Sequence, residues 1–525
     1  GARSLVASCV HPINEGMEIF TNTPLVLNSR RQTLELILST HDRRCLSCVR
    51  SGSCELQTLS HELGVDNEAI FDGENNTYEI DDSAAHMYRD NNKCILCRRC
   101  VAMCDTIQGV SVIGANNRGF ATDIASAFDM GLADTSCVSC GQCIVVCPTG
   151  ALAEKDNTSD VWEALADDSK HVIVQTAPAI RATLGEEFGM EIGTNVQGKM
   201  VAALRRLGFD KVFDTDFSAD LTIMEEATEF IDRVQNDGVL PMITSCSPGW
   251  IKFCEHYYPD MLDNLSSCKS PQQMLGAVIK TYYADKFNID PKDMVVVSIM
   301  PCTAKKFEIG RDDQDASGYP DVDISITTRE LARMIKRAGI EFSQLPDEEF
   351  DHPLGLGTGA GVIFGATGGV MEAALRTAVE KLTGEELDHL DFEQVRGTKG
   401  IKEATYNIDG LDVKVAVVSG LANARTLLDQ IKAGEKEYHF IEIMGCPGGC
   451  VNGGGQPTQP STVRNFTDLS TLRAKALYKQ DASGKYRKSH DNPYIQQLYA
   501  EYLGEPGSEK AHDFLHTKYV KRSIL

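Results

Sequence analysis

Residues Cys94-Ile-Leu-Cys97-Arg-Arg-Cys100-Val-Ala-Met-Cys104 share their cysteine spacing with residues 137–147, which end in Cys147-Pro148. Each run has three cysteines separated by two residues, and a fourth cysteine after three more. In this doubled spacing three near thiolates hold one 4Fe–4S cubane, while the fourth reaches across to the other. Zinc is the alternative, but this spacing fits it poorly. We predict one cluster at Cys94, Cys97, Cys100 and Cys147, and another at Cys104, Cys137, Cys140 and Cys143.

A third cysteine group lies upstream, as His41-x3-Cys45-x2-Cys48-x5-Cys54. Three thiolates leave a cubane one ligand short, and an imidazole can complete the set while raising the reduction potential. A single histidine is more often an ordinary surface residue, but the spacing here favours the ligand role. We therefore predict a third accessory 4Fe–4S cluster.

Composition excludes several classes of protein. Eighteen cysteines in 525 residues are too few for a disulfide scaffold, and their grouping indicates metal or redox work in a reducing, cytoplasmic compartment. The net charge of -24 makes nucleic acid and anionic membranes poor partners. That charge serves either solubility or docking of basic redox partners. No apolar run reaches the roughly 18 residues of a membrane span.

The central part of the chain alternates β-rich apolar runs with helical patterns. Continuous apolar runs of this length are typical of strands covered on both faces. The predicted strands are 171–176, 239–244, 294–299, 413–418 and 439–444, and helices are expected at 218–236, 271–287 and 327–339. This pattern predicts a large α/β domain with largely parallel sheets flanked by helices.

The chain is therefore predicted to be a multidomain α/β protein with iron–sulfur domains at its N-terminal end. We expect a His/Cys3 cluster domain at 31–85, a two-cluster α+β ferredoxin-like domain at 86–158, a catalytic domain at 159–460 and a helical segment at 461–525. Residues 1–30 begin with strand-like Ser4–Cys9 and suggest the tail of a further domain.

Four motifs follow predicted strands of the central domain. They are Thr176-Ala-Pro-Ala179, Thr244-Ser-Cys-Ser-Pro-Gly-Trp250, Met300-Pro-Cys-Thr-Ala-Lys-Lys-Phe-Glu308 and Glu442-Ile-Met-Gly-Cys-Pro-Gly-Gly-Cys450. Ligand sites of α/β sheets lie at the carboxyl ends of their strands. We therefore expect Cys246, Cys302, Cys446 and Cys450 to converge on one buried centre.

In order and spacing, these motifs resemble the three signatures of FeFe (iron-only) hydrogenases, most closely the subunits of NADP-reducing or electron-bifurcating complexes. The resemblance covers essentially the whole chain, including His41 and the eight ferredoxin-type cysteines. It implies an oxidoreductase that interconverts H2 with protons and electrons. The family's active site, the H-cluster, is a 4Fe–4S cubane joined by a bridging thiolate to a two-iron unit with CO, cyanide and dithiolate ligands.

The resemblance also assigns residues by position. Cys302, Cys446 and Cys450 match cubane ligands, with Cys450 as the bridge, and Lys305 matches a lysine that holds a cyanide by a charge-assisted hydrogen bond. The positions that match residues lining the cofactor pocket are Pro178, Gln272, Met300, Phe364 and Met444. Without their positions, such residues would be read as ordinary core.

The chain departs from the family at the first signature, which usually has two adjacent cysteines, the first relaying protons and the second binding the cubane. Here the pair is Cys246-Ser247. A hydroxyl is a much poorer iron ligand than a thiolate. Either Cys246 binds iron and the relay changes, or Ser247 binds iron and Cys246 relays protons; Cys268 is a third conceivable ligand. On the sequence alone we favour Cys246 as the ligand.

Position also suggests a proton route. Glu226 and Glu229 lie three residues apart on a predicted helix, which usually indicates only a solvated face. At this place they match the family's proton-carrying carboxylates, with Ser266 between them and Cys246 at the cofactor.

Electron partners are expected on other subunits. The glycine-rich run 355–361 lacks the strand and acidic residue of a dinucleotide site, and is better explained as a tight packing turn. We therefore expect a flavin- and NAD(P)-binding subunit and a small 2Fe–2S subunit, with ferredoxin as a further electron partner, in a hetero-oligomer. Cys9 matches the last ligand of a plant-type 2Fe–2S domain, so that cluster would need a longer chain.

Two other functions fit parts of the sequence. An iron–sulfur assembly relative would share the fold but would not need Lys305, the pocket methionines and the carboxylate pair together. A hydrogen-sensing relative often lacks the relay cysteine and carries signalling domains, neither of which is seen here.

Overall fold

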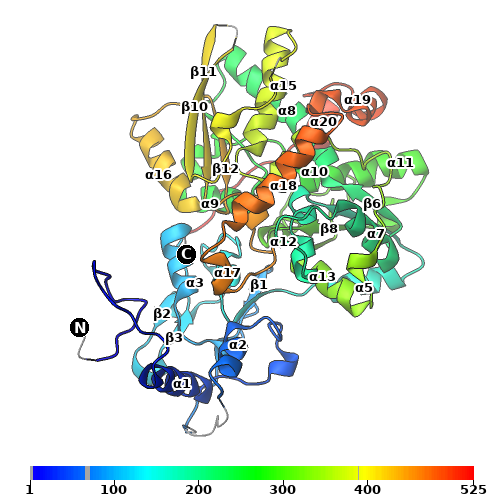
Figure 1. Cartoon of the computed structure of the whole chain (residues 1–525). Coiled ribbons are helices and arrows are strands. Elements are labelled where there is room, and N and C mark those ends of the chain that lie inside the picture. The colour runs from blue at the N-terminus through cyan, green and yellow to red at the C-terminus, as the bar shows by residue number, and fades with distance from the viewer. Residues whose placement is uncertain (1–3, 66–70, 72, 388, 409, 525) are drawn as a thin grey trace.

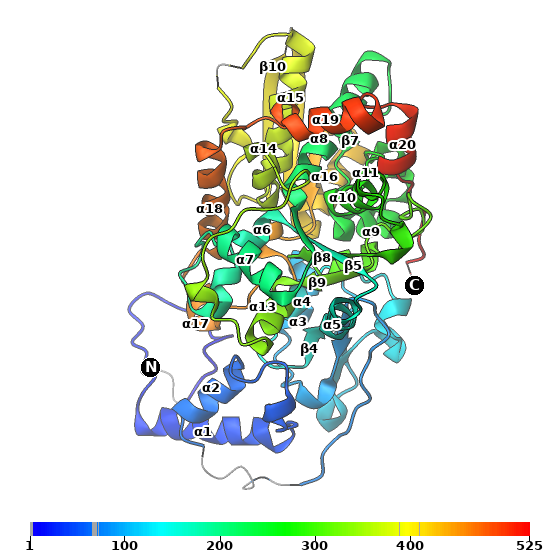
Figure 2. The same ribbon diagram turned by 90° about the vertical axis from the view of Figure 1, so that its right-hand side faces the viewer.

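The computed structural model describes residues 4–65, 71, 73–387, 389–408 and 410–524. The N-terminal iron–sulfur segments form one end of the molecule, and the large α/β part with the C-terminal helices forms the other (Figure 1). Figure 2 shows α1 (Pro24–Ser39) and α2 (Glu55–Glu62) at the outer edge of the N-terminal end.

Helix α1 begins where the sequence supplies both a cap and a helix-starting proline. The Thr23 hydroxyl accepts a hydrogen bond from the Val26 N–H, and Pro24 occupies the first helical position. The helix runs across residue 30, where the sequence suggested a domain boundary. Residues 4–23 form neither helix nor strand, so the strand predicted at Ser4–Cys9 is wrong. A short strand-like run without a neighbouring strand to pair with does not form a ladder.

The segment after α2 has the short strands and helices of a two-cluster iron–sulfur domain. Its two antiparallel sheets pair β1 with β4 and β2 with β3. The elements are β1 (Met87–Arg89), α3 (Arg99–Ala102), β2 (Gly114–Asn116), β3 (Asp123–Ala125), α4 (Gln142–Val146) and β4 (Leu152–Glu154).

Two four-stranded sheets form the large α/β part. The first has the order β6-β5-β8-β9 and is entirely parallel. The second has the order β10-β11-β12-β7, in which β11, β12 and β7 are parallel and β10 is antiparallel to β11. Their bounds are β5 (His171–Thr176), β6 (Lys211–Asp214), β7 (Met242–Ile243), β8 (Met294–Met300), β9 (Ile324–Thr327), β10 (Ile401–Ile408), β11 (Leu411–Ser419) and β12 (Phe440–Met444).

The largely parallel α/β architecture is thus confirmed, and each of the five predicted strands overlaps a strand of the structure. The sequence missed β6 and β9, which are only four residues long. It also missed β10, which is an edge strand whose side chains alternate between covered and exposed positions. Such a strand lacks the continuous apolar run of a strand buried on both faces.

Helix α8 (Thr215–Gln235) lies between the two sheets. Phe217 and Leu221 pack in a core with Ile173 of the first sheet, whereas Ile223 and Phe230 pack in a core that includes residues of the second. Because both faces are covered, the helix can hold buried carboxylates between the sheets. The other helices here are α5 (Thr158–Ala166), α6 (Pro178–Arg181), α7 (Gln197–Leu207), α9 (Pro248–Tyr257), α10 (Pro271–Val278), α11 (Ala284–Phe287), α12 (Ala304–Glu308), α13 (Thr328–Arg337), α14 (Gly359–Val362), α15 (Gly369–Thr383) and α16 (Leu421–Lys432).

The C-terminal segment is helical, as predicted, and lies against the large α/β part (Figure 1). Its helices are α17 (Ser461–Arg464), α18 (Leu469–Ser483), α19 (Pro493–Leu498) and α20 (Glu509–Leu515). The glycine-rich run before and within α14 is a packing turn. A Cβ on Gly357 would lie 2.2 Å from the Asp216 Cβ of α8, and one on Gly359 would lie 2.0 Å from the Asp481 Oδ1 of α18.

Candidate active site and iron–sulfur sites

Two cavities of the ferredoxin-like segment are each lined by four cysteines. One cavity has Cys94, Cys97, Cys100 and Cys147 in its wall. The other has Cys104, Cys137, Cys140 and Cys143. The structure therefore brings together the two sets that the doubled spacing predicted, each drawing its distant cysteine from the other run.

The repeated spacing is matched by a repeated backbone conformation. Leu96 and Ser139 stand at the same place in the two runs and have φ of 54° and 61°. Arg98 and Gly141 are also equivalent and have φ of 59° and 67°. This left-handed backbone is uncommon outside glycine. The Leu96 N–H points at the Cys94 sulfur at 3.4 Å, and such amide donors stabilise thiolates.

The group of His41, Cys45, Cys48 and Cys54 lies beside this segment. A Cβ on Gly150, three residues after Cys147, would lie 2.5 Å from the Cys48 sulfur. The His41 Nδ1 atom is buried and has no hydrogen-bond partner among the described residues. Burial lowers the pKa of His41, which favours the neutral imidazole that binds metals. A buried ring nitrogen without a partner, in the same segment as three thiols, fits a cluster ligand.

The four motifs at the strand ends enclose one cavity between the sheets. Strands β5, β7, β8 and β12 end at residues 176, 243, 300 and 444, immediately before or within these motifs. The cavity has a volume of about 80 Å³. Its wall includes all the residues that the resemblance named for it, which are Pro178, Cys246, Gln272, Met300, Cys302, Lys305, Phe364, Met444, Cys446 and Cys450. The chain thus offers soft thiol ligands beside an otherwise largely apolar pocket, which suits an iron–sulfur group.

Lys305 on α12 places its ammonium at this cavity. Its Nζ donates to the Glu308 Oε2 atom at 2.9 Å and to the Cys246 carbonyl at 3.3 Å. Glu308 also accepts from the Gln272 Nε2 and the Ser270 hydroxyl, each at 2.9 Å. The buried carboxylate thus orients the lysine and Gln272 together. Sequence reasoning missed this role of Glu308, although its spacing of three residues from Lys305 was a usable signal.

The adjacent Cys246 and Ser247 face different neighbours. The Cys246 thiol lies near the Glu226 carboxylate and the Cys450 sulfur, and burial raises its pKa well above the ordinary value. The Ser247 hydroxyl accepts a hydrogen bond from the Gly445 N–H at 3.1 Å, next to Cys446. Although Ser247 occupies the cap position of α9, its side chain makes no capping bond. Cys268 lies outside this cavity, beside Glu229, so the structure does not support it as a cubane ligand.

A chain of polar side chains leads from the surface to Cys246. Glu229 is 15% exposed, its Oε1 accepts from Arg233 Nη2 at 2.6 Å, and its Oε2 accepts from the Ser266 hydroxyl at 2.9 Å. Glu226 is fully buried, with its Oε2 lacking a hydrogen-bond partner in the described part of the chain. Burial, assisted by the nearby Glu229, raises the pKa of Glu226 to about 8. A carboxyl with this pKa can carry a proton near neutral pH. Arg233, four residues after Glu229, was missed by the sequence reasoning.

The second ferredoxin-type cavity adjoins the active-site cavity. The Thr303 hydroxyl, next to Cys302, donates to the Ser139 carbonyl at 2.8 Å. The Gln142 amide donates to the Asn452 carbonyl at 2.9 Å, two residues after Cys450. A Cβ on Gly454 would lie 2.2 Å from the Cys140 carbonyl, so only glycine permits this close approach. The loop of the second cysteine run is therefore packed directly on the cofactor loops.

Family comparison decides the class. The model described as "Iron only hydrogenase large subunit, C-terminal domain" matches residues 170–454, more than half of the chain. The chain belongs to the iron-only hydrogenase family. Further models match at 467–522 (iron hydrogenase small subunit), 30–69 (NADH-ubiquinone oxidoreductase-G iron-sulfur binding region) and 93–151 (4Fe-4S dicluster domain).

Comparison with individual relatives supports the same family assignment. The NADP-reducing hydrogenase subunit HndD of Solidesulfovibrio fructosivorans is 54% identical over 100% of this chain and 90% of its own length. Iron hydrogenase 1 of Clostridium pasteurianum is 44% identical over 98% of this chain and 90% of its own. The solved structure of a variant of apo FeFe-hydrogenase from Chlamydomonas reinhardtii is 44% identical, with a TM-score of 0.63 over 70% of this chain and all of that one. Among the described residues no helix is both long and apolar enough to cross a bilayer.

Proposed function

We propose that this chain is the catalytic subunit of a hydrogenase complex and catalyses reversible H2 oxidation and proton reduction. The observation that carries the proposal is the cavity between the two sheets, where three thiols, the Cys246-Ser247 pair and the Lys305 ammonium meet. A buried set of this kind, in a chain of the iron-only hydrogenase family, suits an iron–sulfur centre for H2 chemistry.

In this proposal Cys302, Cys446 and Cys450 would hold the cubane of the H-cluster, with Cys450 as the thiolate shared with the two-iron unit. That group would supply the H2 chemistry itself, which protein side chains cannot provide. Lys305, held by Glu308, would offer its ammonium to the group as a charge-assisted hydrogen-bond donor. Apolar side chains such as Met300, Met444 and Phe364 exclude water from the pocket.

Three accessory 4Fe–4S clusters carry the electrons. Their order follows from the packing: the His41 group lies beside the Cys147 loop, and the Cys140 loop lies on the active-site loops. We propose the sequence from the His41 cluster, through the cluster of Cys94, Cys97, Cys100 and Cys147, to the cluster of Cys104, Cys137, Cys140 and Cys143. The domain bounds 31–85, 86–158, 159–460 and 461–525 are proposed with the same roles.

Protons move through a series of carboxyl, hydroxyl and thiol side chains. In this proposal Glu229 takes a proton at the surface, Ser266 passes it to Glu226, and Glu226 delivers it to the Cys246 thiol at the cavity. Ser266 hydrogen-bonds to Glu229 and to Glu226, and the charge of Glu226 acts on the Cys246 thiol. Arg233 orients Glu229 through its ion pair.

Electron partners are other subunits. The similarity to a subunit named as NADP-reducing supports a cytoplasmic hetero-oligomer in which a flavin- and NAD(P)-binding subunit and a small 2Fe–2S subunit exchange electrons with this chain. A ferredoxin is a further candidate partner. A 2Fe–2S cluster at Cys9 is proposed only for a chain that extends beyond Gly1.

Infrared spectroscopy of the matured protein tests the function. CO and cyanide bands, together with H2 evolution from a reduced low-potential dye, are the expected results. Absence of the bands from matured protein would favour an iron–sulfur assembly role, and full bands with very slow turnover would favour a hydrogen sensor.

A further inference from the structure

A thiol, an imidazole and a carboxylate meet outside the cofactor cavity, where the C-terminal segment covers α8. Three potential ligand atoms lie within 4.8 Å of one another, one each from Cys268, His516 and Glu229. The Cys268 sulfur is 3.9 Å from the Glu229 Oε2 atom. The cofactor site and its ligands do not include Cys268 or His516, so this cluster needs its own explanation.

The backbone holds Cys268 and His516 of this group of side chains in place. Cys268 and His516 face each other in an antiparallel β-bridge. The Lys269 N–H donates to the Leu515 carbonyl at 2.7 Å, and the Thr517 N–H donates to the Ser267 carbonyl at 2.8 Å. Two chain segments about 250 residues apart are thus fixed side by side. The side chains of Cys268 and His516 therefore approach each other without rearrangement of the main chain.

Both ring nitrogens of His516 have partners that fix the ring. Nε2 lies 3.1 Å from the Glu225 Oε2 atom, and Nδ1 lies 2.8 Å from the Ser267 hydroxyl. Glu225 is itself buried and accepts from the Gly507 N–H at 2.9 Å and from the Tyr499 hydroxyl. Whichever nitrogen binds a cation, the other keeps a hydrogen bond. Such outer partners orient the histidines of protein metal sites.

The donor set defines the class of ion. Magnesium and calcium prefer sites made of oxygen atoms alone. One thiolate, one imidazole and one carboxylate suit zinc, and three protein ligands leave its fourth position for water. The Cys268 thiol releases one proton when its sulfur binds the ion, while the Glu229 Oε1 atom keeps its contact with Arg233. The exposed edge of Glu229 provides the side from which an ion enters.

We propose that Cys268, His516 and Glu229 form a zinc-binding site, and that an ion bound there blocks proton entry. Glu229 is the outermost carboxylate of the proton route, and its Oε2 is the atom that accepts from Ser266. An ion on that oxygen competes with the proton and with the Ser266 hydrogen bond. The blocking step rests on the proposed function, whereas binding of the ion does not.

Binding is tested on the protein with all its clusters. Zinc sulfate is titrated against a chromophoric chelator, and zinc-edge X-ray absorption identifies the ligands. The wild-type protein is expected to bind one more zinc ion than Cys268→Ala, with one sulfur ligand. His516→Gln removes a ligand and is expected to weaken binding by at least the roughly 10–100-fold typical for loss of an outer partner of a metal ligand. Cys254→Ala removes another fully buried thiol, which packs in a different hydrophobic cluster from Cys268 and is not one of these ligands, and this variant is expected to bind zinc as wild type does. Equal zinc binding by wild type and both site variants would overturn the site.

Turnover tests the consequence. Zinc is expected to lower H2 evolution of wild type by about tenfold or more, since a positioned proton carrier contributes at least that much. A chelator should restore the rate, and the same concentration of magnesium should have no effect. Cys268→Ala should keep its basal rate and lose the sensitivity to zinc. Zinc bound at this site without slower turnover would overturn the blocking step. An absence of H2 turnover in zinc-free protein would overturn the proposed function while the binding result stands.

Discussion

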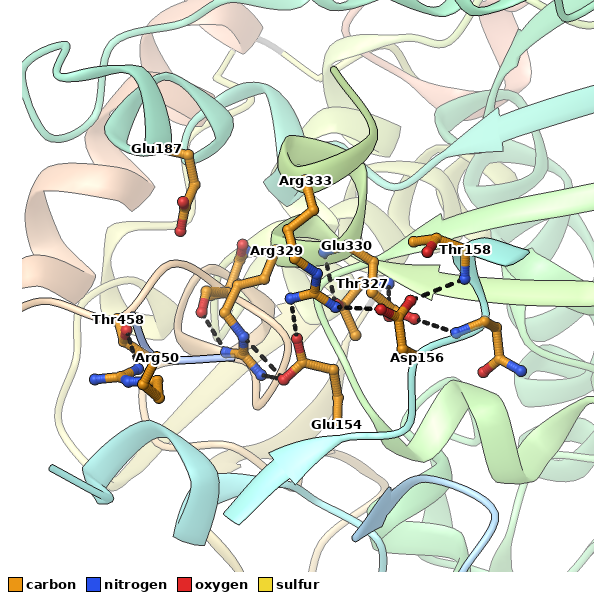
Figure 3. A network of polar contacts seen from close by, with 12 residues as sticks. Arg50, Glu154, Asp156, Thr158, Glu187, Thr327, Arg329, Glu330, Arg333 and Thr458 are labelled. Carbon is orange, nitrogen blue, oxygen red and sulfur yellow. Dashed lines mark hydrogen bonds and ion pairs between the residues drawn. The ribbon is translucent and has the colours of Figure 1, made fainter. Parts of the chain in front are cut away.

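Glu154, the last residue of β4, forms a buried ion pair with Arg329 of α13, with 2.7 Å between its Oε2 atom and the arginine Nη2 (Figure 3). Arg333 reaches the other carboxylate oxygen at 2.8 Å. Arg329 also donates to the carbonyls of Gly454 and Gln456, which follow the Cys450 loop. One guanidinium therefore joins the ferredoxin-like segment to the active-site loop.

Removal of the Glu154 charge is expected to destabilise the contact between the ferredoxin-like segment and the active-site loop. Burial alone would raise the pKa of Glu154, but the two arginines lower it overall. Glu154→Gln leaves the buried Arg329 without its anion and leaves the half-buried Arg333 with only the more distant Asp156, which costs about 3–5 kcal/mol for a broken buried pair. Calorimetry should therefore show a lower unfolding temperature. Because the folded-state pKa is lowered, this stabilisation is present above the unfolded pKa near 4.5 and is lost as the pH falls.

The exposed pair of Lys432 and Asp260 is the matched control. Its partners are 44% and 56% exposed, so Asp260→Asn should change stability by no more than about 1 kcal/mol. An effect of Glu154→Gln as small as that of Asp260→Asn would contradict the structural role of the buried pair.

His41 is expected to control the potential of the outermost cluster. His41→Cys should retain that cluster and lower its reduction potential, because a thiolate replaces a neutral imidazole. The measurement is a redox titration followed by electron paramagnetic resonance, with total iron of about 18 atoms per fully loaded chain under these ligation rules. His61→Gln, a change to another histidine of the same region, is the control. An unchanged titration in His41→Cys would show that His41 is not a ligand.

Glu226→Gln should separate proton transfer from folding. The amide cannot carry the proton, so H2 evolution should fall by about 10²–10⁴-fold while the infrared bands remain. The pKa of Glu226 is raised to about 8, so wild type loses stability as the pH rises from about 4.5 to 8, where only the unfolded state is ionised. At pH 9 the variant should therefore unfold at a higher temperature than wild type. A lower unfolding temperature at that pH would contradict the buried, protonated state of Glu226.

The sequence predicted the ligand groups better than their surroundings. Fixed spacing within a few residues determines which thiols can share a cubane, so the two sets of four were predictable from residues 94–147 alone. The roles of Glu308, Arg233 and Glu154 depend on contacts made by folding. Arg329, for example, lies 175 residues from Glu154, and no local pattern marks the pair. The edge strand β10 was missed for the same reason, since its partner defines it.

One residue of the pair Cys246-Ser247 is expected to bind the cubane and the other to relay protons. The sequence alone could not assign these two roles. The sequence favoured Cys246 as the cubane ligand because a thiolate binds iron better than a hydroxyl. The geometry favours the opposite assignment. Cys246 lies near Glu226, at the end of the proton route, whereas the Ser247 hydroxyl makes no helix-capping bond and accepts from the N–H of Gly445, the residue before Cys446.

Three variants decide between these assignments. If Cys246 relays protons, Cys246→Ala should retain full active-site iron and normal CO and cyanide bands, but lose about 10²–10⁴-fold in turnover. Ser247→Cys should hold the cubane at least as firmly as wild type, because it supplies a thiolate where the hydroxyl now stands. Ser247→Ala should leave the cubane with three ligands and release iron faster on exposure to a chelator. Loss of the cubane in Cys246→Ala, together with unchanged iron retention in Ser247→Ala, would instead make Cys246 the fourth ligand and require another group to carry the proton.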